Sequence, residues 1–154
     1  MAEAPQQPSF QIEKIYVKDI SLEIPNAPQV FLEPQGPQLE IQVRNESAQF
    51  AEGLYEVVIT VTVTAKAGDK TMFLAEASQA GIFSLRGVPQ GDLEPLLAVA
   101  CPTILYPYAR ETISDLVTRG GFPPVLLAPV SFEAIYAQRL QQQGGAGPRI
   151  ELAS

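Results

Sequence analysis

The chain has 154 residues, of which 46% are hydrophobic, and it carries a formal net charge of −7 without a single histidine. A chain of this length has room for one domain with a buried core, and its apolar content excludes a wholly disordered protein. An acidic surface repels the phosphates of nucleic acids and anionic membranes. The composition therefore argues against a nucleic-acid partner and against direct membrane insertion.

Sequence features of an active site are sparse. Without histidine, the chain lacks the commonest general base, the commonest metal ligand and the usual partner of a serine or cysteine nucleophile. No cysteine spacing suits zinc, and Gly81, Gly87 and Gly91 are too scattered for a phosphate loop. The only cysteine, Cys101, lies in an apolar stretch that indicates a buried structural thiol. We therefore predict no catalytic residue, no metal, no cofactor and no enzyme activity.

Both ends of the chain have the composition of disordered tails. Residues 1–8 are rich in glutamine and proline, and residues 144–154 begin with Gly-Gly-Ala-Gly-Pro, so one folded domain is expected over residues 9–143. The first nine residues have neither the basic nor the apolar region of a secretory signal. A single cysteine is compatible with a reducing compartment, so we expect a cytoplasmic protein.

The first half of the folded part predicts strands. Apolar positions over residues 10–23 change parity twice, which indicates an irregular strand with bulges or a bend. Four prolines over residues 24–38 exclude a helix or a central strand there. Regular alternation over residues 39–44 and 54–65 predicts two more strands, and a hairpin connection leads to a fourth over residues 71–83.

The second half predicts helices. Asp92 can cap a short amphipathic helix that we expect Pro102 to end. A second helix is expected from about residue 107 to the glycines at 120 and 121, and a third, capped by Ser131, over residues 131–143. Strands followed by helices predict an α+β fold, in which an antiparallel sheet is packed with two or three helices.

Apolar residues also occur where a monomer does not need them. Val30, Phe31 and Leu32 form an apolar island in the proline-rich connection, and Leu126 and Leu127 lie in an extended link before the last helix. Each single residue is explained equally well by an ordinary core, whereas the set as a whole is compatible with a binding groove.

The fourth predicted strand has one face of small or neutral side chains. Ala75, Ala77 and Gln79 alternate with larger or charged neighbours, so this face permits close approach of another protein layer. That layer is either a second subunit or a helix of the same chain.

Several motifs in this order resemble the SecB family of chaperones. Residues 101–111, Cys-Pro-Thr-Ile-Leu-Tyr-Pro-Tyr-Ala-Arg-Glu, resemble the family's CPxILFPYARE signature. The resemblance covers about residues 10–143, and Ser131 stands where the family usually has asparagine. Further similar segments are Ile15–Ser21, Pro25–Pro28, Leu74–Glu76, Gly81–Phe83, Gly120–Pro123 and Leu127–Phe132.

The resemblance implies a fold, an assembly and a function. It implies a four-stranded antiparallel sheet per subunit and a homotetramer built as a dimer of dimers. It also implies an ATP-independent chaperone that binds unfolded precursor proteins, keeps them translocation-competent and delivers them to the SecA motor. SecA would dock through its basic, zinc-bearing C-terminal segment, so the zinc belongs to SecA. The alternative is a SecB-like chaperone that serves another client system, such as a toxin–antitoxin pair.

The resemblance also implies three sets of site residues. The SecA-binding residues would be Asp19, Glu23, Leu74 and Glu76, and their presence favours export over the alternative. The client-binding groove would use Val30, Phe31, Leu39, Ile41, Val43, Leu127, Phe132, Ile135, Tyr136 and Leu140. The subunit interface would use Ala75, Ala77, Gln79, Ile113, Leu116 and Val117.

Overall fold

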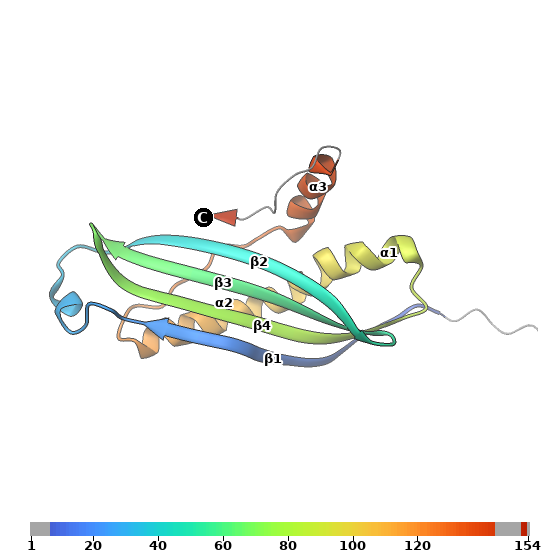
Figure 1. Ribbon diagram of the computed structural model, residues 1–154, viewed down its shortest axis with the longest axis horizontal. Coiled ribbons are helices and arrows are strands. Elements are labelled where there is room, and N and C mark those ends of the chain that lie inside the picture. Colours follow the sequence, from blue (N-terminus) through green and yellow to red (C-terminus); the bar gives the residue numbers. More distant parts are fainter. Residues whose placement is uncertain (1–6, 144–151, 154) are drawn as a thin grey trace, which may run out of the picture.

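The computed structural model describes residues 7–143 and 152–153. Its strands are β1 (Ser9–Glu23), β2 (Gln38–Ala51), β3 (Leu54–Ala67), β4 (Lys70–Arg86) and β5 (Leu152–Ala153). Its helical elements are the 3₁₀ turn η1 (Gln29–Leu32), α1 (Gln90–Pro95), the π-helix η2 (Leu96–Ala100), α2 (Cys101–Arg119) and α3 (Phe132–Gln142). The strands form one antiparallel sheet in the order β1-β4-β3-β2-β5 (Figure 1).

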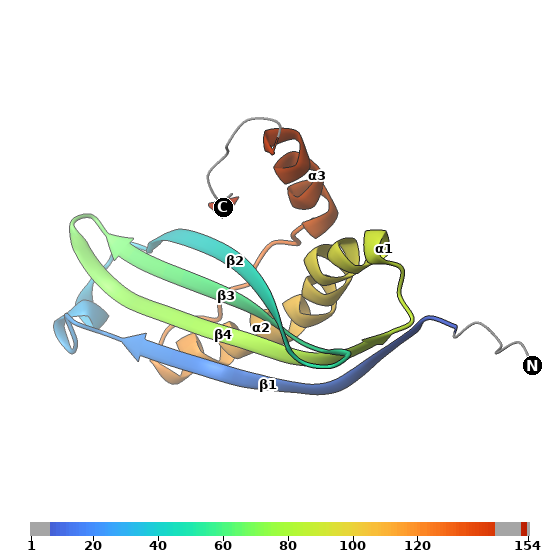
Figure 2. The same ribbon diagram turned by 45° about the vertical axis from the view of Figure 1, so that its right-hand side comes forward.

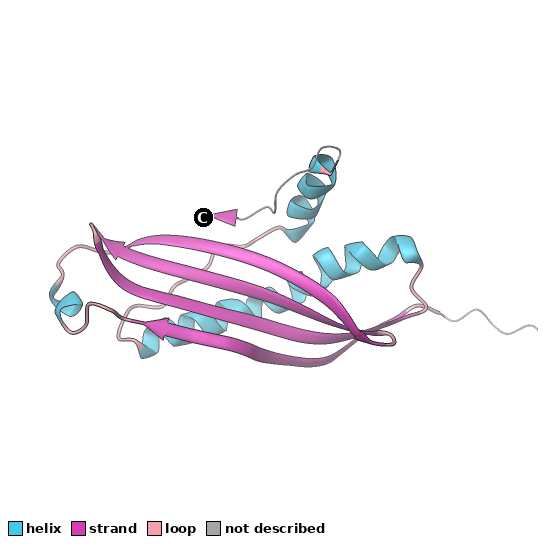
Figure 3. Cartoon of the chain, viewed as in Figure 1, coloured by secondary structure: helices cyan, strands magenta, loops and turns pink. Residues whose placement is uncertain are grey.

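The architecture confirms the predicted α+β fold. The four long strands form a curved sheet, and α2 runs along one of its faces while α3 stands beyond the β2 edge (Figures 2 and 3). The short strand β5 is an addition, because residues 152 and 153 fall in the predicted disordered tail but pair with β2. The rest of that prediction concerns residues 1–6, 144–151 and 154, which lie outside the described residues.

The parity changes in β1 have the predicted cause. The register of β1 against β4 shifts between Ile12 and Lys14, and again between Val17 and Asp19. Each shift inserts one extra residue, which moves the following side chains to the other parity. As a result, six apolar residues of β1 lie opposite β4 residues of a single parity and therefore face the same side of the sheet. They are Phe10, Ile12, Ile15, Val17, Ile20 and Leu22.

The helical region differs from the prediction, because Pro102 does not end a helix. The α1, η2 and α2 segments follow one another without a break from Gln90 to Arg119. The wider π-turn lies just before Pro102, and the side-chain amide of Asn45 donates to the Ala98 carbonyl at 3.5 Å. That carbonyl is the one that the missing N–H of residue 102 would reach in a regular α-helix. The turn and this donor together explain how the proline is accommodated.

The main core lies between α2 and the central strands. Leu105, Ala109, Ile113 and Val117 follow one another at four-residue intervals on α2, and all are completely buried. They face Val57, Ile59, Val61 and Val63 of β3, which are also completely buried. Each such large side chain stabilises the fold by about 1.5–3 kcal/mol, so this contact fixes α2 on the sheet.

The helix approaches β4 closely at a glycine. A Cβ atom at Gly81 would lie 2.9 Å from Leu105 of α2 and 2.8 Å from the ring of Phe83. These separations are shorter than van der Waals contact, so a larger residue here would displace the buried side chains of Leu105 and Phe83.

The small face of β4 is covered by the same chain, so its assignment to a subunit interface is wrong. Ala75, Ala77 and Gln79 are 1%, 0% and 4% exposed beneath α2. The hydroxyl of Thr112 on α2 donates to the Gln79 side-chain carbonyl at 2.8 Å, and the Gln79 amide donates to the Tyr16 carbonyl. The layer that the small side chains admit is therefore α2.

Two of the three predicted interface residues on α2 need the same correction. Ile113 and Val117 are completely buried against the sheet, because they share the helix face that α2 turns toward β3. Leu116 is half-buried and is the one member of the predicted interface that keeps accessible surface.

Candidate functional sites: an apolar groove and a polar sheet face

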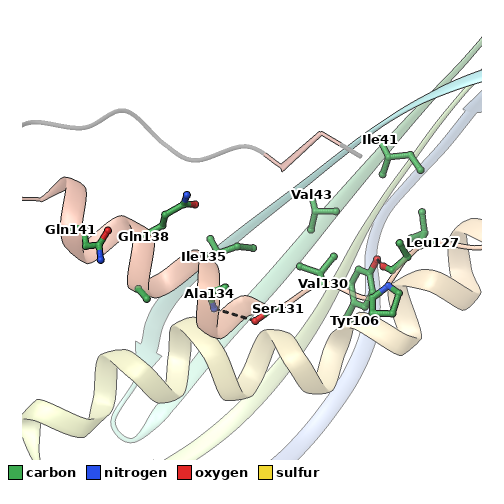
Figure 4. Close-up of a pocket in the computed structure, with 13 residues that line it drawn as sticks. Ile41, Val43, Tyr106, Leu127, Val130, Ser131, Ala134, Ile135, Gln138 and Gln141 are labelled. Atoms are coloured by element: carbon green, nitrogen blue, oxygen red, sulfur yellow. Dashed lines mark hydrogen bonds between the residues drawn. The ribbon is translucent and has the colours of Figure 1, made fainter.

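An apolar groove of about 640 Å³ lies between β2, the link that follows α2, and α3 (Figure 4). Its walls come from β2 and from three consecutive segments far from β2 in sequence: Ile41 and Val43 on β2, Tyr106 on α2, Val130 on the link and Ile135 on α3. We call this site the groove. The described residues that line it are Ile41, Val43, Tyr106, Leu127, Ala128, Pro129, Val130, Ser131, Ala134, Ile135, Ala137, Gln138 and Gln141.

Two hydrogen bonds hold the link and α3 in place. Tyr106 donates its hydroxyl to the Ala128 carbonyl, and this fixes the link against α2. Ser131 has an extended backbone and accepts a hydrogen bond from the Ala134 N–H at 3.1 Å, which confirms it as the cap of α3. At the start of α3 the buried Phe132 packs against Tyr106, so both the link and α3 are anchored on α2 and the groove that they form with β2 is preformed.

The apolar wall on β2 continues beyond the groove. Leu39 lies on the same strand face as Ile41 and Val43, and it is 39% exposed. Ala65 on β3 lies opposite Leu39, and Phe73 on β4 lies opposite Ala65. The ring centroid of Phe73 lies 4.8 Å from that of Phe122.

Phe31 extends this aromatic cluster to the surface. Its ring stacks on Phe122 with the centroids 5.3 Å apart, and half of its surface (51%) is exposed. From Leu39 to Val43 the strand advances about 13 Å, at about 3.3 Å per residue. Leu39 thus extends the apolar face of β2 beyond the groove, and the buried Ala65, Phe73 and Phe122 lie between it and the exposed ring of Phe31.

The ten predicted client-binding residues do not all lie in the groove. Those that line it are Ile41, Val43, Leu127 and Ile135; those exposed beyond it are Phe31 and Leu39; those buried in the core are Val30 and Phe132, at 4% and 3% exposure. Tyr136 lines a different pocket, near Phe10 and Leu96, and Leu140 is exposed on α3 outside the groove lining.

The sequence analysis did not identify the polar rim of the groove. Ala134, Gln138 and Gln141 follow Ser131 at spacings of three or four residues, which places them on one face of α3. Among the described residues that line the groove, none is charged. An uncharged stripe of small and amide side chains along this helix was therefore the signal that could have revealed the rim.

The four predicted SecA-binding residues lie together on the other face of the sheet. Glu23 is opposite Leu74 in the β1–β4 register, Ser21 is opposite Glu76, and Asp19 precedes Ser21 by two positions on the same face. These side chains alternate with the residues beneath α2, so they point away from the helix. We call this surface the polar face: Asp19, Ser21, Glu23, Leu74, Glu76 and Ser78, with Thr60, Thr62 and Thr64 of β3 beside them.

The carboxylates of the polar face lie outside the ion pairs found among the described residues. Within residues 7–143, none of Asp19, Glu23 and Glu76 takes part in an ion pair. The Glu76 carboxylate accepts a hydrogen bond from the Thr62 hydroxyl at 2.8 Å, which orients it without neutralising it. The polar face therefore presents three negative charges on two neighbouring strands.

A neighbouring carboxylate is neutralised instead. Glu56 pairs with Lys18 at 2.7 Å and also accepts a hydrogen bond from the Tyr16 hydroxyl. The Lys18 hydrogen bond lowers the pKa of Glu56, and partial burial together with the carboxylate raises the pKa of Tyr16 to about 12. This cluster joins β1 to β3 across β4, so its contribution is structural.

The single thiol is not available for chemistry. Cys101 is completely buried, and burial raises its pKa to about 12, so the nucleophilic thiolate is scarce at neutral pH. Among the residues that the structure describes, no three His, Cys, Asp or Glu side chains cluster as a metal site would require. No helix in the same residues has the length and apolar character needed to cross a membrane.

Residues 3–143 match the family model of preprotein translocase subunit SecB. The chain belongs to the SecB family. Among its relatives are protein-export proteins SecB of Methylobacillus flagellatus and Chromobacterium violaceum, each 62% identical over 141 residues. These alignments cover 92% of this chain and 90% and 94% of the relatives. The protein-export protein SecB of Dechloromonas aromatica is 57% identical over 147 residues. That alignment covers 96% of this chain and 97% of the relative. SecB is a family of protein-export chaperones, not of enzymes.

The fold is also similar to a solved SecB structure. The SecB-like chaperone Rv1957 of Mycobacterium tuberculosis, in complex with a ChAD peptide from the HigA1 antitoxin, aligns with a TM-score of 0.65. The alignment covers 79% of this chain and 90% of the other, at 22% sequence identity. At that identity the similarity establishes the shared fold.

Proposed function

We propose that the protein is a cytoplasmic, ATP-independent chaperone that holds unfolded precursor proteins in the groove and delivers them to SecA. The observation that carries this proposal is a preformed, uncharged groove in a chain of the protein-export family. Such a groove accepts apolar segments of many sequences, because apolar burial is not directional. Folded proteins hide these segments, so only chains that are slow to fold would be held.

The groove suits an extended chain. Its walls are apolar, whereas the amides of Gln138 and Gln141 on its rim can both donate to and accept from the backbone of a client. Binding of the unfolded state by mass action keeps it unfolded, so holding needs no nucleotide hydrolysis. The protein would therefore work without enzyme activity.

We also propose that the chain forms a homotetramer built as a dimer of dimers. The support lies on the edge strand β1, where Ile12, Val17 and Ile20 are 48%, 44% and 47% exposed on one face. An unpaired edge with an exposed apolar row is suited to contact with a second copy. Several linked grooves would hold one long client with an avidity gain of ~10²–10⁴.

The polar face supports the proposal of SecA as the receiving partner. Its three unpaired carboxylates complement a basic segment such as the zinc-bearing C-terminus of SecA. Leu74 lies among them and supplies an apolar contact. Because the polar face and the groove are on opposite sides of the sheet, a client and SecA could bind at the same time.

Service to a toxin–antitoxin pair is less well supported than export. The relative with an antitoxin peptide is 22% identical to this chain, whereas protein-export relatives are 53–62% identical over most of its length. The four residues predicted for SecA also lie on one face, which an export chaperone would need.

A test of client holding uses charges placed on either side of the sheet. Val130→Asp with Ile135→Asp adds two carboxylates to the groove, where both native side chains are only half-buried. The matched control, Thr60→Asp with Thr64→Asp, adds the same two charges to the other side of the sheet.

The measurement is the refolding rate of a slow-folding precursor with stoichiometric chaperone and no ATP. The parent and the control should arrest refolding, and the groove variant should not; arrest by all three would refute the groove as the binding site.

A further inference from the structure

The end of the chain pairs with the free edge of β2. Leu152 lies opposite Val43, and Ala153 lies opposite Gln42, in an antiparallel ladder. The other edge of β2 is fully used by β3, so β5 occupies the only side of β2 that can accept a further strand.

The position of β5 places it beside the groove. Val43 belongs both to the β5 pairing and to the groove lining, and Ile41 lines the groove one side-chain repeat away. The pairing with Gln42 and Val43 places β5 beside β2, the strand that forms one side of the groove (Figure 4). A strand on this edge therefore lies where a client in the groove would have its backbone.

Most of this edge is left unpaired by β5. The strand β2 runs from Gln38 to Ala51, and β5 pairs with two of its residues. An unpaired edge offers backbone N–H and C=O groups to any extended chain, whatever its side chains. Backbone pairing is sequence-independent, and this property suits a chaperone that holds many different clients.

We propose that the β2 edge at Gln42 and Val43 is a strand-docking site, which the chain's own C-terminal residues Leu152 and Ala153 occupy until an extended client segment displaces them. The proposal rests on the proposed function, since it names how a client engages the groove. A two-residue ladder is short, so a longer client strand that pairs along more of β2 outcompetes it. While Leu152 and Ala153 cover the edge, no client strand can pair there. The apparent client affinity is therefore the intrinsic affinity multiplied by the fraction of time that the edge is free.

The test removes the pairing without removing the segment. Leu152→Pro with Ala153→Pro deletes both backbone N–H groups of β5 and prevents a ladder. The matched control, Leu152→Thr with Ala153→Val, changes the same side chains but keeps the N–H groups and favours a strand. Hydrogen exchange is measured on backbone amides of residues 38–46, without any client and at two protein concentrations.

The second measurement is affinity for a permanently unfolded protein, such as reduced and carboxymethylated α-lactalbumin. We expect amides near Gln42 and Val43 to exchange faster in the proline variant alone, at both protein concentrations. We also expect this variant to bind the unfolded protein about fivefold more tightly, the gain for an edge that is covered for about 80% of the time.

Three results would overturn the inference. Equal exchange in all variants would show that β5 does not protect the edge, and protection that depends on protein concentration would assign the edge to a second copy of the chain. Faster exchange with unchanged client affinity would show that clients do not use the edge. If no variant binds the unfolded protein, the proposed function itself fails; the exchange experiment, which contains no client, separates that failure from the others.

Discussion

The two sides of the sheet carry opposite chemistry although the same strands build both. Toward α2, β3 presents Val57, Ile59, Val61 and Val63, which are completely buried, and toward the open side it presents Thr60, Thr62 and Thr64. Strict alternation along a strand produces this division without any further device. Beyond the edge of the helix layer, the apolar side opens into the groove, whereas the other side stays polar and acidic.

This difference indicates two kinds of recognition. The groove has no charge and must bind through apolar area, so its affinity should depend weakly on salt. The polar face has three uncompensated carboxylates, so its affinity for a basic segment should fall as salt screens the charges. The sheet separates the two and allows each to be changed alone.

The largest effect is expected where the groove side merges with the core. Phe132 is 3% exposed and packs edge-on against Tyr106, with the ring centroids 5.8 Å apart. Phe132→Ala should lower the free energy of unfolding by about 3–5 kcal/mol, because it leaves a cavity. Urea denaturation measures this loss. Phe31→Ala is the control, since Phe31 is half exposed; an equal loss in both variants would mean that Phe132 is not a core residue.

A smaller effect is expected within the groove side, where position matters more than exposure. Ile41→Ala should weaken client binding about fivefold, because about 1 kcal/mol of apolar contact is lost. Leu126→Ala should leave client binding unchanged, although Leu126 is 84% exposed, since it lies outside the groove lining. Fluorescence titration with an unfolded client compares the two. Equal weakening would argue for a diffuse apolar surface in place of a groove.

The smallest effect is expected from the ion pair on the polar side. The pKa of Glu56 is lowered in the folded chain, so its pairing with Lys18 stabilises the fold above the ordinary carboxyl pKa of 4.5. This contribution disappears as the pH falls through the lowered value. Glu56→Gln should therefore reduce Tm at pH 7 by at most about 3 °C, because exposed pairs contribute little. In thermal denaturation the difference in Tm should shrink as the pH is lowered below 4.5; a difference that does not change with pH would point to packing as the cause.

Much of the local structure behind the groove side and the polar side of the sheet was predictable from local sequence patterns. The bulges in β1 follow from its parity changes, and Ser131 was identified as a helix cap from sequence alone. Asp19 and Glu76 are grouped by the family resemblance, whereas their adjacency in space depends on β1 pairing with β4, which no local pattern specifies. Pro102 predicts a helix end that is absent, because a π-turn and the distant Asn45 accommodate the proline.

Other features could not be read from one sequence because they depend on which elements meet. Ala75 and Ala77 look the same whether a second subunit or α2 covers them, and the structure shows that α2 does. Phe132 and Ile135 are both apolar positions of one helix, yet the first is buried and the second lines the groove. The polar rim and β5 depend in the same way on tertiary contacts with β2.

The separation of the two faces is tested most directly by a reciprocal binding experiment. Titration calorimetry would measure an unfolded client and the SecA C-terminal segment, loaded with zinc, against two variants. The polar-face variant, Asp19→Lys with Glu76→Lys, should bind the SecA segment at least about tenfold more weakly and the client normally, since charge reversal costs more than 1.4 kcal/mol. The groove variant, Val130→Asp with Ile135→Asp, should show the opposite loss. A loss of both partners in either variant, or normal SecA binding by the polar-face variant, would contradict the assignment of the two faces.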